Sequence, residues 1–167
     1  TYGFKMINGY EAGFVELSKE ELEKGEKFNF NEFVKAKHSI RMFSAEPISG
    51  DVFREAIKIA LQAPSACNRQ PCKVYYSLDK EKNRILGKMV PGNKSFENDV
   101  PYYCVVTAER SFFGEAEVFQ WYMNGGIFVS YLTLALHALG IGSCIFQWPD
   151  FYETEKRVRE HIGIKES

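Results

Sequence analysis

The segment 63–72, with the sequence APSACNRQPC, constrains this chain more than any other. An amphipathic pattern before it predicts a helix over 51–62, and a β-branched and aromatic run after it predicts a strand over 74–77. Its two prolines and short polar side chains favour a stiff helix-to-strand loop. Asn and Gln side chains each carry a donor and an acceptor, which suits them to the edge of a flat heterocycle. We expect this loop to present three polar side chains outward: Ser65, Asn68 and Gln70.

Composition limits the classes of protein that this chain can belong to. A length of 167 residues suits one domain with a substantial core, and the 15% aromatic content indicates large buried surfaces or a dimer interface. A formal charge of -1 gives no electrostatic case for nucleic acid or for an acidic membrane surface. No secretory signal is visible, and no apolar run reaches the ~18 residues of a spanning helix. These features predict a cytoplasmic protein without nucleic-acid or membrane partners.

The four cysteines are scattered and form no CxxC pair, so the spacing of a zinc site is absent. We therefore predict no metal site and interpret the cysteines as mostly buried, reduced thiols of a cytosolic protein. A disulfide between Cys67 and Cys72 is the less favoured alternative.

The N-terminal part reads as a lead-in over 1–29 that contains one short helix. Ser18 and Glu21 form a capping box, which predicts a charged helix that ends at Gly25. Asn29 or Asn31 then caps a second helix, with an apolar face made by Phe30, Phe33 and Val34.

The remaining chain alternates helices and strands. Hydrophobic patterning predicts helices and strands over these ranges: helices at 80–89, 117–139 and 153–162, and strands at 102–108 and 143–146. The longest helix contains Gly125 and Gly126, where we expect an interruption or a kink. This order predicts an α+β or α/β fold with a central sheet flanked by helices.

A short basic segment, Lys37-His38-Ser39-Ile40-Arg41, follows the second helix. Alternate residues of an extended segment point the same way, so Lys37, Ser39 and Arg41 are placed to converge on one anion. The alternative interpretation is a helix C-terminus whose basic residues complement the helix dipole. His137, inside the longest apolar pattern, is interpreted as a core histidine rather than a catalytic one.

Four segments in order resemble the nitroreductase family, whose members hold FMN at a dimer interface: 37–41, 64–71, 124–144 and 145–149. The resemblance implies a nitroreductase-like α+β fold in three layers, with a central, mainly antiparallel sheet flanked by helices. It implies an FMN-binding domain over 30–167 and a homodimer with FMN at its interface. The family usually closes with a further strand and a basic residue or two that complete the phosphate clamp, whereas this sequence stops at Ser167 after a helix. We expect either that this member lacks that strand or that the given sequence is cut short before it.

The resemblance also assigns residues to the cofactor, all of them by position in a matching motif. It implies that the FMN phosphate and ribityl chain are held by Lys37, His38, Ser39 and Arg41. It implies that FMN is contacted from the loop by Pro64, Ser65, Asn68 and Gln70. Backbone N–H groups near the reactive flavin atoms would come from Phe146 and Gln147, and Arg69 would add positive charge. The chain departs from the family in having Cys72 for an aromatic residue, Gln147-Trp148 for glycine, and Lys37 for the commoner arginine.

The function implied by the resemblance is an FMN-dependent oxidoreductase. Hydride would pass from NAD(P)H through the flavin to a small-molecule acceptor, a nitroaromatic, quinone or similar compound, in a ping-pong cycle. No catalytic side chain is expected, because the flavin carries the chemistry. Two alternatives stay open: a flavin-binding or flavin-free non-catalytic module of a longer protein, and a specialised flavin chemistry such as reductive dehalogenation.

Overall fold

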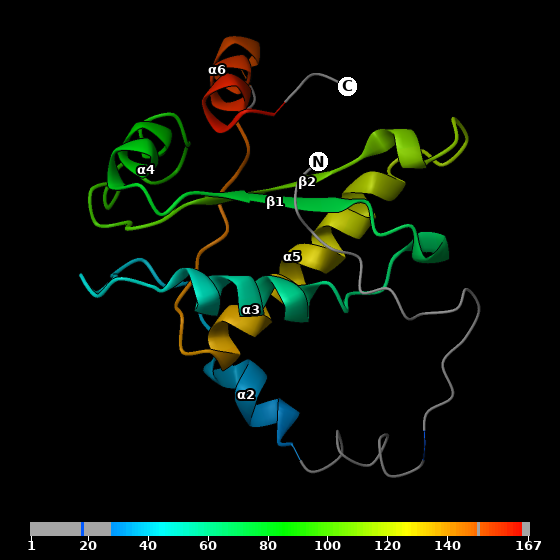
Figure 1. Ribbon diagram of the computed structural model, residues 1–167, viewed down its shortest axis with the longest axis horizontal. Helices are drawn as coiled ribbons and strands as arrows, with labels where there is room; N and C mark the ends of the chain where they lie inside the picture. Colours follow the sequence, from blue (N-terminus) through cyan, green and yellow to red (C-terminus); the bar gives the residue numbers. More distant parts are fainter. Residues whose placement is uncertain (1–17, 19–27, 150, 165–167) are drawn as a thin grey trace. The chain divides into compact units, whose positions relative to one another are not determined.

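The structure is a computed structural model that describes residues 18, 28–149 and 151–164 (Figure 1). The chain divides between Ala36 and Lys37 into two units, which are described separately. The short helix predicted between Ser18 and Gly25 lies outside the described residues, apart from Ser18 itself.

In the first unit, the helix α2 spans Phe30–Ala36. Asn29 caps it, because the Asn29 side-chain oxygen accepts a hydrogen bond from the backbone N–H of Glu32 at 3.2 Å. The Phe28 and Phe33 rings meet edge to face, with centroids 5.1 Å apart. The predicted helix is therefore confirmed, and of the two candidate caps the structure selects Asn29.

The second unit is built on two antiparallel strands, β1 (Cys72–Tyr76) and β2 (Cys104–Ala108). Cys72 lies opposite Ala108, and Tyr76 lies opposite Cys104. Both predicted strands are thus confirmed with shifted ends. Because side chains alternate along a strand, each strand of this pair sends apolar groups to both faces.

The prediction of a third strand over 143–146 is wrong. Ser143 forms only an isolated parallel bridge with Ser39, in which the Ile40 N–H donates to the Ser143 carbonyl oxygen at 3.0 Å. The pairing does not extend because the chain turns away to place the Phe146 ring against Phe96, with centroids 5.7 Å apart. The apolar character of this segment therefore serves side-chain packing rather than a strand.

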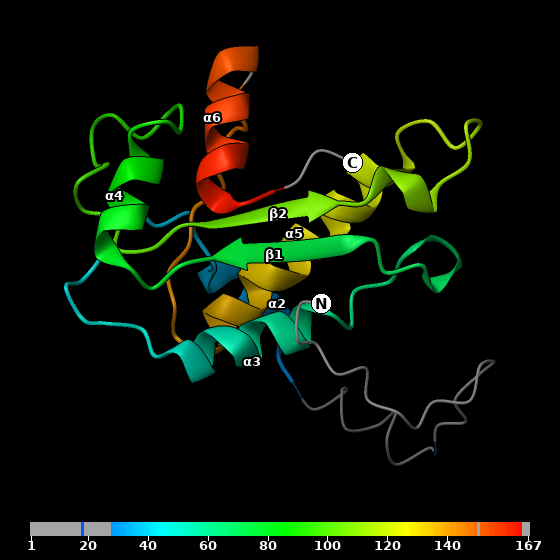
Figure 2. The ribbon, with the colours of Figure 1, turned by 45° about the horizontal axis from the view of Figure 1, so that its top comes forward.

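One face of the sheet is covered by α3 (Gly50–Ala60) and α5 (Gln120–Ala138), as Figure 2 shows. The buried core there is contributed by both helices: Phe53, Ala56, Ile57, Ala60, Phe128, Leu132, Ala135 and Leu136. The expected interruption of α5 is absent, and the helix is continuous through Gly125 and Gly126. A Cβ atom on Gly125 would lie 3.9 Å from the Cβ of Ala108, so this glycine sits where the helix passes β2. Glycine retains its backbone N–H, so the helical hydrogen bonds are kept.

The opposite face of the sheet is covered by α4 (Lys80–Gly87) and α6 (Tyr152–Ile162). Their shared core is small and consists of Leu86, Tyr103, Val105 and Val158. Asp79 caps α4 by accepting the N–H groups of Glu81 and Lys82 at 2.8 and 3.0 Å, and these bonds lower the pKa of its carboxyl group, with Lys82 giving the largest effect. Helices on both faces of an antiparallel pair confirm the predicted α+β, three-layer class.

Gly142 allows the segment before Ser143 to approach Ile40. A Cβ atom at Gly142 would lie 3.0 Å from Cγ1 of Ile40, closer than side chains normally pack. We expect Gly142→Ala to lower the free energy of unfolding by about 1–3 kcal/mol through overpacking. Urea unfolding monitored by circular dichroism measures this change. Gly114→Ala is the control, since the nearest atom to its new Cβ lies 3.6 Å away. Equal midpoints for the two variants would contradict the close approach.

Candidate functional site

The isolated bridge between Ser39 and Ser143 brings two predicted site segments together. Lys37–Arg41 lies beside the start of the segment 143–147, although the two are about a hundred residues apart in sequence. Lys37 is half-buried, whereas His38, Ser39 and Arg41 are exposed. In the described part of the chain, neither the Lys37 ammonium nor the Arg41 guanidinium forms an ion pair with a carboxylate. Both cations are therefore open to an external anion, as a phosphate site requires.

The loop that follows α3 is fixed by its own polar groups. The Ser65 hydroxyl accepts a hydrogen bond from the Gln70 N–H at 2.9 Å, which closes the loop upon itself. Three non-glycine residues adopt left-handed backbone angles: Cys67 (φ 53°), Asn68 (φ 53°) and Gln70 (φ 47°). Such angles are unfavourable and persist only when the surrounding structure imposes them, often at functional sites. The predicted stiff loop is thus observed, and it includes a short 3₁₀ turn over Ala66–Asn68.

The polar side chains of the loop lie at its surface. Asn68 and Gln70 are exposed, and the Gln70 amide donates to the Asn68 side-chain oxygen at 3.3 Å. Pro64 is exposed and Ser65 is half-buried. Among the described residues, no hydrogen bond or ion pair joins this loop to 37–41 or to 143–147. The predicted site residues of one chain therefore form two clusters. One cluster is the loop 64–70, and the other consists of 37–41 and 143–147.

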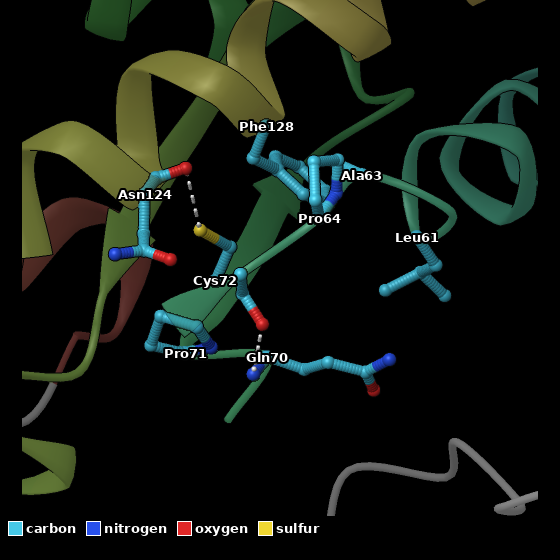
Figure 3. Close-up of a pocket in the computed structure, with 9 residues that line it drawn as sticks. Leu61, Ala63, Pro64, Gln70, Pro71, Cys72, Asn124 and Phe128 are labelled. Carbon is cyan, nitrogen blue, oxygen red and sulfur yellow. Dashed lines mark hydrogen bonds between the residues drawn. The ribbon is translucent and has the colours of Figure 1, made fainter. Parts of the chain in front are cut away.

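Asn124 on α5 anchors the loop, and sequence reasoning did not assign it to the site. Its side-chain oxygen accepts the Ala66 N–H at 2.9 Å, and its amide donates to the Gln120 carbonyl at 2.6 Å. The Cys72 thiol donates to the Asn124 carbonyl oxygen at 3.7 Å (Figure 3). Asn124 is only 4% exposed. An amide within the mainly apolar pattern of this helix was the available signal, because a buried amide requires polar partners.

Only a small pocket lies between Asn124 and the loop. It is lined by parts of α5 and of the loop (Figure 3), and it encloses about 20 Å³. That is room for about one water molecule. A flat ring system therefore cannot enter this pocket, and a ligand of the loop would lie against the exposed side where Asn68 and Gln70 point.

Arg69 braces the loop from the other side. Its guanidinium pairs with the Glu117 carboxylate at 2.6 Å and lies 5.3 Å from the centroid of the Phe113 ring. The pairing lowers the pKa of Glu117, first through Arg69 and then through the Gly114 N–H. Because that pKa is lowered, the pair is fully present above the ordinary carboxyl pKa and is lost as the pH falls through the lowered one. Much of the Arg69 charge is thus engaged inside the protein.

In the segment after Ser143, one predicted site residue is packed against the core and the other lies at the surface. The Phe146 ring packs on Phe96 and Tyr103, with centroids 5.7 and 6.2 Å away, and is thereby taken up by the second core. Gln147 is exposed. The side chain of Phe146 is thus structural. Its backbone groups are the part that is left to form hydrogen bonds with a ligand.

The four cysteines are free, and Cys67 is exposed while the other three are half-buried. The expectation of buried thiols is therefore wrong for Cys67, because the left-handed turn lifts it to the surface. No disulfide joins Cys67 to Cys72. Burial raises the pKa of the Cys72 and Cys104 thiols to about 11.

We expect a thiol reagent such as DTNB to modify Cys67 first. An increase of the pKa from 9.0 to about 11 leaves Cys72 and Cys104 with about a hundredfold less thiolate at neutral pH. The fast phase of the labelling time course should disappear in Cys67→Ser and persist in Cys104→Ser. A fast phase that survives the loss of Cys67 would contradict this assignment.

Among the described residues, no group of three or more His, Cys, Asp or Glu side chains is placed to hold a metal ion. None of the helices in that part of the chain has the length and apolar character needed to cross a bilayer.

The fold and these clusters define an α+β protein of the nitroreductase type, and comparisons with known proteins agree. Residues 34–100 match the family model described as "Nitroreductase family". A protein of Archaeoglobus fulgidus named as an NADH dehydrogenase/NAD(P)H nitroreductase is 27% identical over 140 residues, which cover 78% of this chain and 74% of that protein. The chain is thus similar to the nitroreductase family in sequence over 34–100 and to this relative over most of its length.

Solved structures show the same fold. An FMN-dependent nitroreductase from Clostridium difficile R20291 superposes with a TM-score of 0.68 and 26% identity, covering 80% of this chain and 78% of that one. A nitroreductase of Desulfovibrio desulfuricans solved in complex with FMN superposes with a TM-score of 0.61 at 22% identity, covering 70% of this chain and 66% of that one. The predicted nitroreductase-like fold is therefore confirmed.

Proposed function

We propose that this chain is an FMN-dependent oxidoreductase of the cytoplasm that passes electrons from NADH or NADPH to a small acceptor such as a nitroaromatic or a quinone. The similarity to the nitroreductase family and the printed names of the relatives, which include FMN and NAD(P)H, support the proposal. The observation that carries it is the bridge from Ser39 to Ser143, which sets free cations beside a main-chain segment. Residues 30–167 form the flavin-binding domain in this proposal, and 1–29 form a lead-in.

The residues present fit an FMN phosphate. Lys37 supplies a point charge, and Arg41 supplies a planar fork that donates two parallel hydrogen bonds. Ser39 and His38 add donors from the same segment, with Ser39 held by the bridge to Ser143. Neither cation is paired with a carboxylate among the described residues. An anion bound here would therefore break no ion pair among the described residues.

The residues of the loop fit the edge of a ring. Asn68 and Gln70 are exposed, and their backbone is fixed at left-handed angles, so the loop presents amide donors and acceptors with little loss of backbone entropy on binding. Pro64 and Ser65 form the base of the loop, with Ser65 closing it through the Gln70 N–H at 2.9 Å. Asn124 keeps the loop in place from beneath.

FMN, when bound, supplies the hydride and electron chemistry. The chain's own residues bind and orient the cofactor. In this proposal, main-chain N–H groups near Phe146 and Gln147 donate hydrogen bonds to developing negative charge. No side chain is needed as a nucleophile, and the thiols of Cys72 and Cys104 are unsuited to that role because burial raises their pKa to about 11.

The proposed working form is a homodimer, in which a second copy covers one side of α5. Four large apolar side chains are exposed along that helix, with Met123 (59%), Ile127 (38%) and Tyr131 (39%) at four-residue intervals and Tyr122 (68%) next to Met123. Gly126 and Ser130 lie among them and allow close approach. An uncovered apolar stripe of this length is typical of a protein interface.

Light scattering should give twice the mass of one chain, and Ile127→Asp should give a monomer that no longer retains FMN. A wild-type monomer that retains FMN would contradict the dimeric site.

Steady-state kinetics test the activity itself. Rates with menadione or nitrofurazone, measured at several NADPH or NADH concentrations, should give parallel double-reciprocal lines, because one substrate leaves before the other binds. Intersecting lines would contradict the ping-pong order. FMN binding without oxidation of either nicotinamide, with any acceptor, would favour a non-catalytic flavin module instead.

A further inference from the structure

A basic groove lies between α4, the turn that follows it, and α6. It has a volume of about 540 Å³, within the usual range of small-molecule sites, about 300–1,000 Å³. Four cationic residues line it: Arg84, Lys88, Lys94 and Arg157. No carboxylate is among the lining residues that the structure describes. The groove shares no residue with those assigned to FMN.

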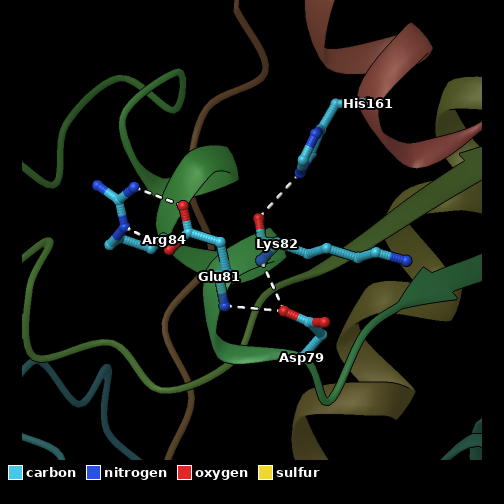
Figure 4. Close-up of polar contacts among 5 residues, drawn as sticks. All are labelled: Asp79, Glu81, Lys82, Arg84 and His161. Atoms are coloured by element: carbon cyan, nitrogen blue, oxygen red, sulfur yellow. Dashed lines mark hydrogen bonds and ion pairs between the residues drawn. The ribbon is translucent and has the colours of Figure 1, made fainter.

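The two helices that form the walls of this groove, α4 and α6, are packed against each other. Leu86 of α4 and Val158 of α6 belong to the same buried core. A second link joins the helices at their surface, where Nε2 of His161 lies 2.9 Å from the Lys82 carbonyl oxygen (Figure 4). The groove is therefore bounded by packed helices rather than by two independent segments.

The charge in the groove is only partly compensated. Glu81 holds the Arg84 guanidinium through two hydrogen bonds of 2.8 and 2.5 Å (Figure 4). In the described part of the chain, Lys88, Lys94 and Arg157 form no such ion pair. A terminal phosphate carries about −1.5 to −2 charges at neutral pH, which three cations are able to neutralise.

The groove also offers an apolar and aromatic surface. Phe151 is 74% exposed and lines it together with Met89 and Pro149. The exposed Phe151 ring provides a stacking surface for a flat base.

We propose that this groove binds a nucleotide, with its phosphates between Lys88, Lys94 and Arg157 and its base against Phe151. Inorganic phosphate would use the cations but not the apolar wall, so it should bind more weakly. The nucleotide has two sources, a free nucleotide or the nucleotide half of a dinucleotide. The proposal does not rest on the flavin assignment.

Isothermal titration of the purified protein with ADP, in low salt with excess FMN in cell and syringe, tests the proposal. ADP should bind with one-to-one stoichiometry, and Arg157→Gln and Lys94→Gln should each weaken it about tenfold. Lys156→Gln is the matched control, because it removes the same charge from an exposed neighbour outside the groove. Phe151→Ala should weaken ADP about fivefold or more and leave inorganic phosphate unchanged. Thermal unfolding checks that each variant is folded.

Three results of these titrations would overturn the proposal, and a further titration identifies the source of the nucleotide. No saturable ADP binding, equal effects of Arg157→Gln and Lys156→Gln, or phosphate binding as tight as ADP binding would each overturn the proposal. Titration with NADP⁺ distinguishes the sources. Binding of NADP⁺ that competes with ADP and weakens in Arg157→Gln supports the dinucleotide, and binding of ADP alone supports a free nucleotide.

Discussion

Replacing Lys37 and Arg41 together by alanine is expected to weaken FMN binding by about a hundredfold. Each side chain would donate charge-assisted hydrogen bonds to the phosphate, and the loss of one such contact weakens binding about tenfold. Neither cation is compensated by a carboxylate in the described residues, so the substitutions leave no buried charge behind. The effect on affinity should therefore come with little change in stability.

Fluorescence quenching of FMN titrated with each variant measures this loss. The double variant Lys80→Ala/Lys156→Ala is the control, since it removes the same net charge from exposed positions outside the proposed site. It should bind FMN as the unmodified protein does. Tight retention of yellow FMN by the Lys37/Arg41 variant through gel filtration would refute the phosphate assignment.

Asn124→Ala should release the loop from α5 and lower both stability and FMN affinity. The Ala66 N–H and the Gln120 carbonyl would each lose an Asn124 partner that lies at 2.9 and 2.6 Å. The Gln120 carbonyl keeps its helical partner, the backbone N–H of residue 124, so the Ala66 N–H is the group left without one. A buried polar group without a partner costs about 1–3 kcal/mol, and we expect the free energy of unfolding to fall by about that amount. The loop holds left-handed angles only while its surroundings impose them, so Asn68 and Gln70 should become less well placed.

Urea unfolding and FMN titration together measure this effect. Ser111→Ala is the control outside the proposed site and interface, because its exposed hydroxyl donates to the Glu109 carboxylate at 2.9 Å. We expect it to change stability by less than about 0.5 kcal/mol. If Asn124→Ala loses stability and keeps FMN affinity, the anchor is structural and the loop does not depend on it for binding.

The elements with local signals were predicted well from the sequence. Helical periodicity located α3, α4, α5 and α6 to within a few residues of their ends. The third strand was predicted wrongly, because periodicity does not distinguish an extended segment that pairs from one whose ring packs elsewhere, as Phe146 does on Phe96.

The candidate site was predicted as separate motifs, and their placement needed the structure. Neither segment alone indicates that Ser39 lies beside Ser143, because that bridge depends on how the whole chain packs. Asn124 was missed for the same reason, since its partner Ala66 lies 58 positions away. The basic groove is lined both by Lys94, which follows α4, and by Arg157 of α6. These residues lie far apart in the sequence, so no local pattern predicts the groove.

The visible absorption spectrum of the purified protein, recorded with FMN and then after anaerobic addition of NADPH or NADH, tests the central proposal most directly. We expect flavin bands that stay with the protein through gel filtration, bleach on addition of the reduced nicotinamide, and return when menadione or a nitroaromatic is added. A colourless protein that takes up no FMN, or a bound flavin that neither nicotinamide bleaches, would contradict the proposed function.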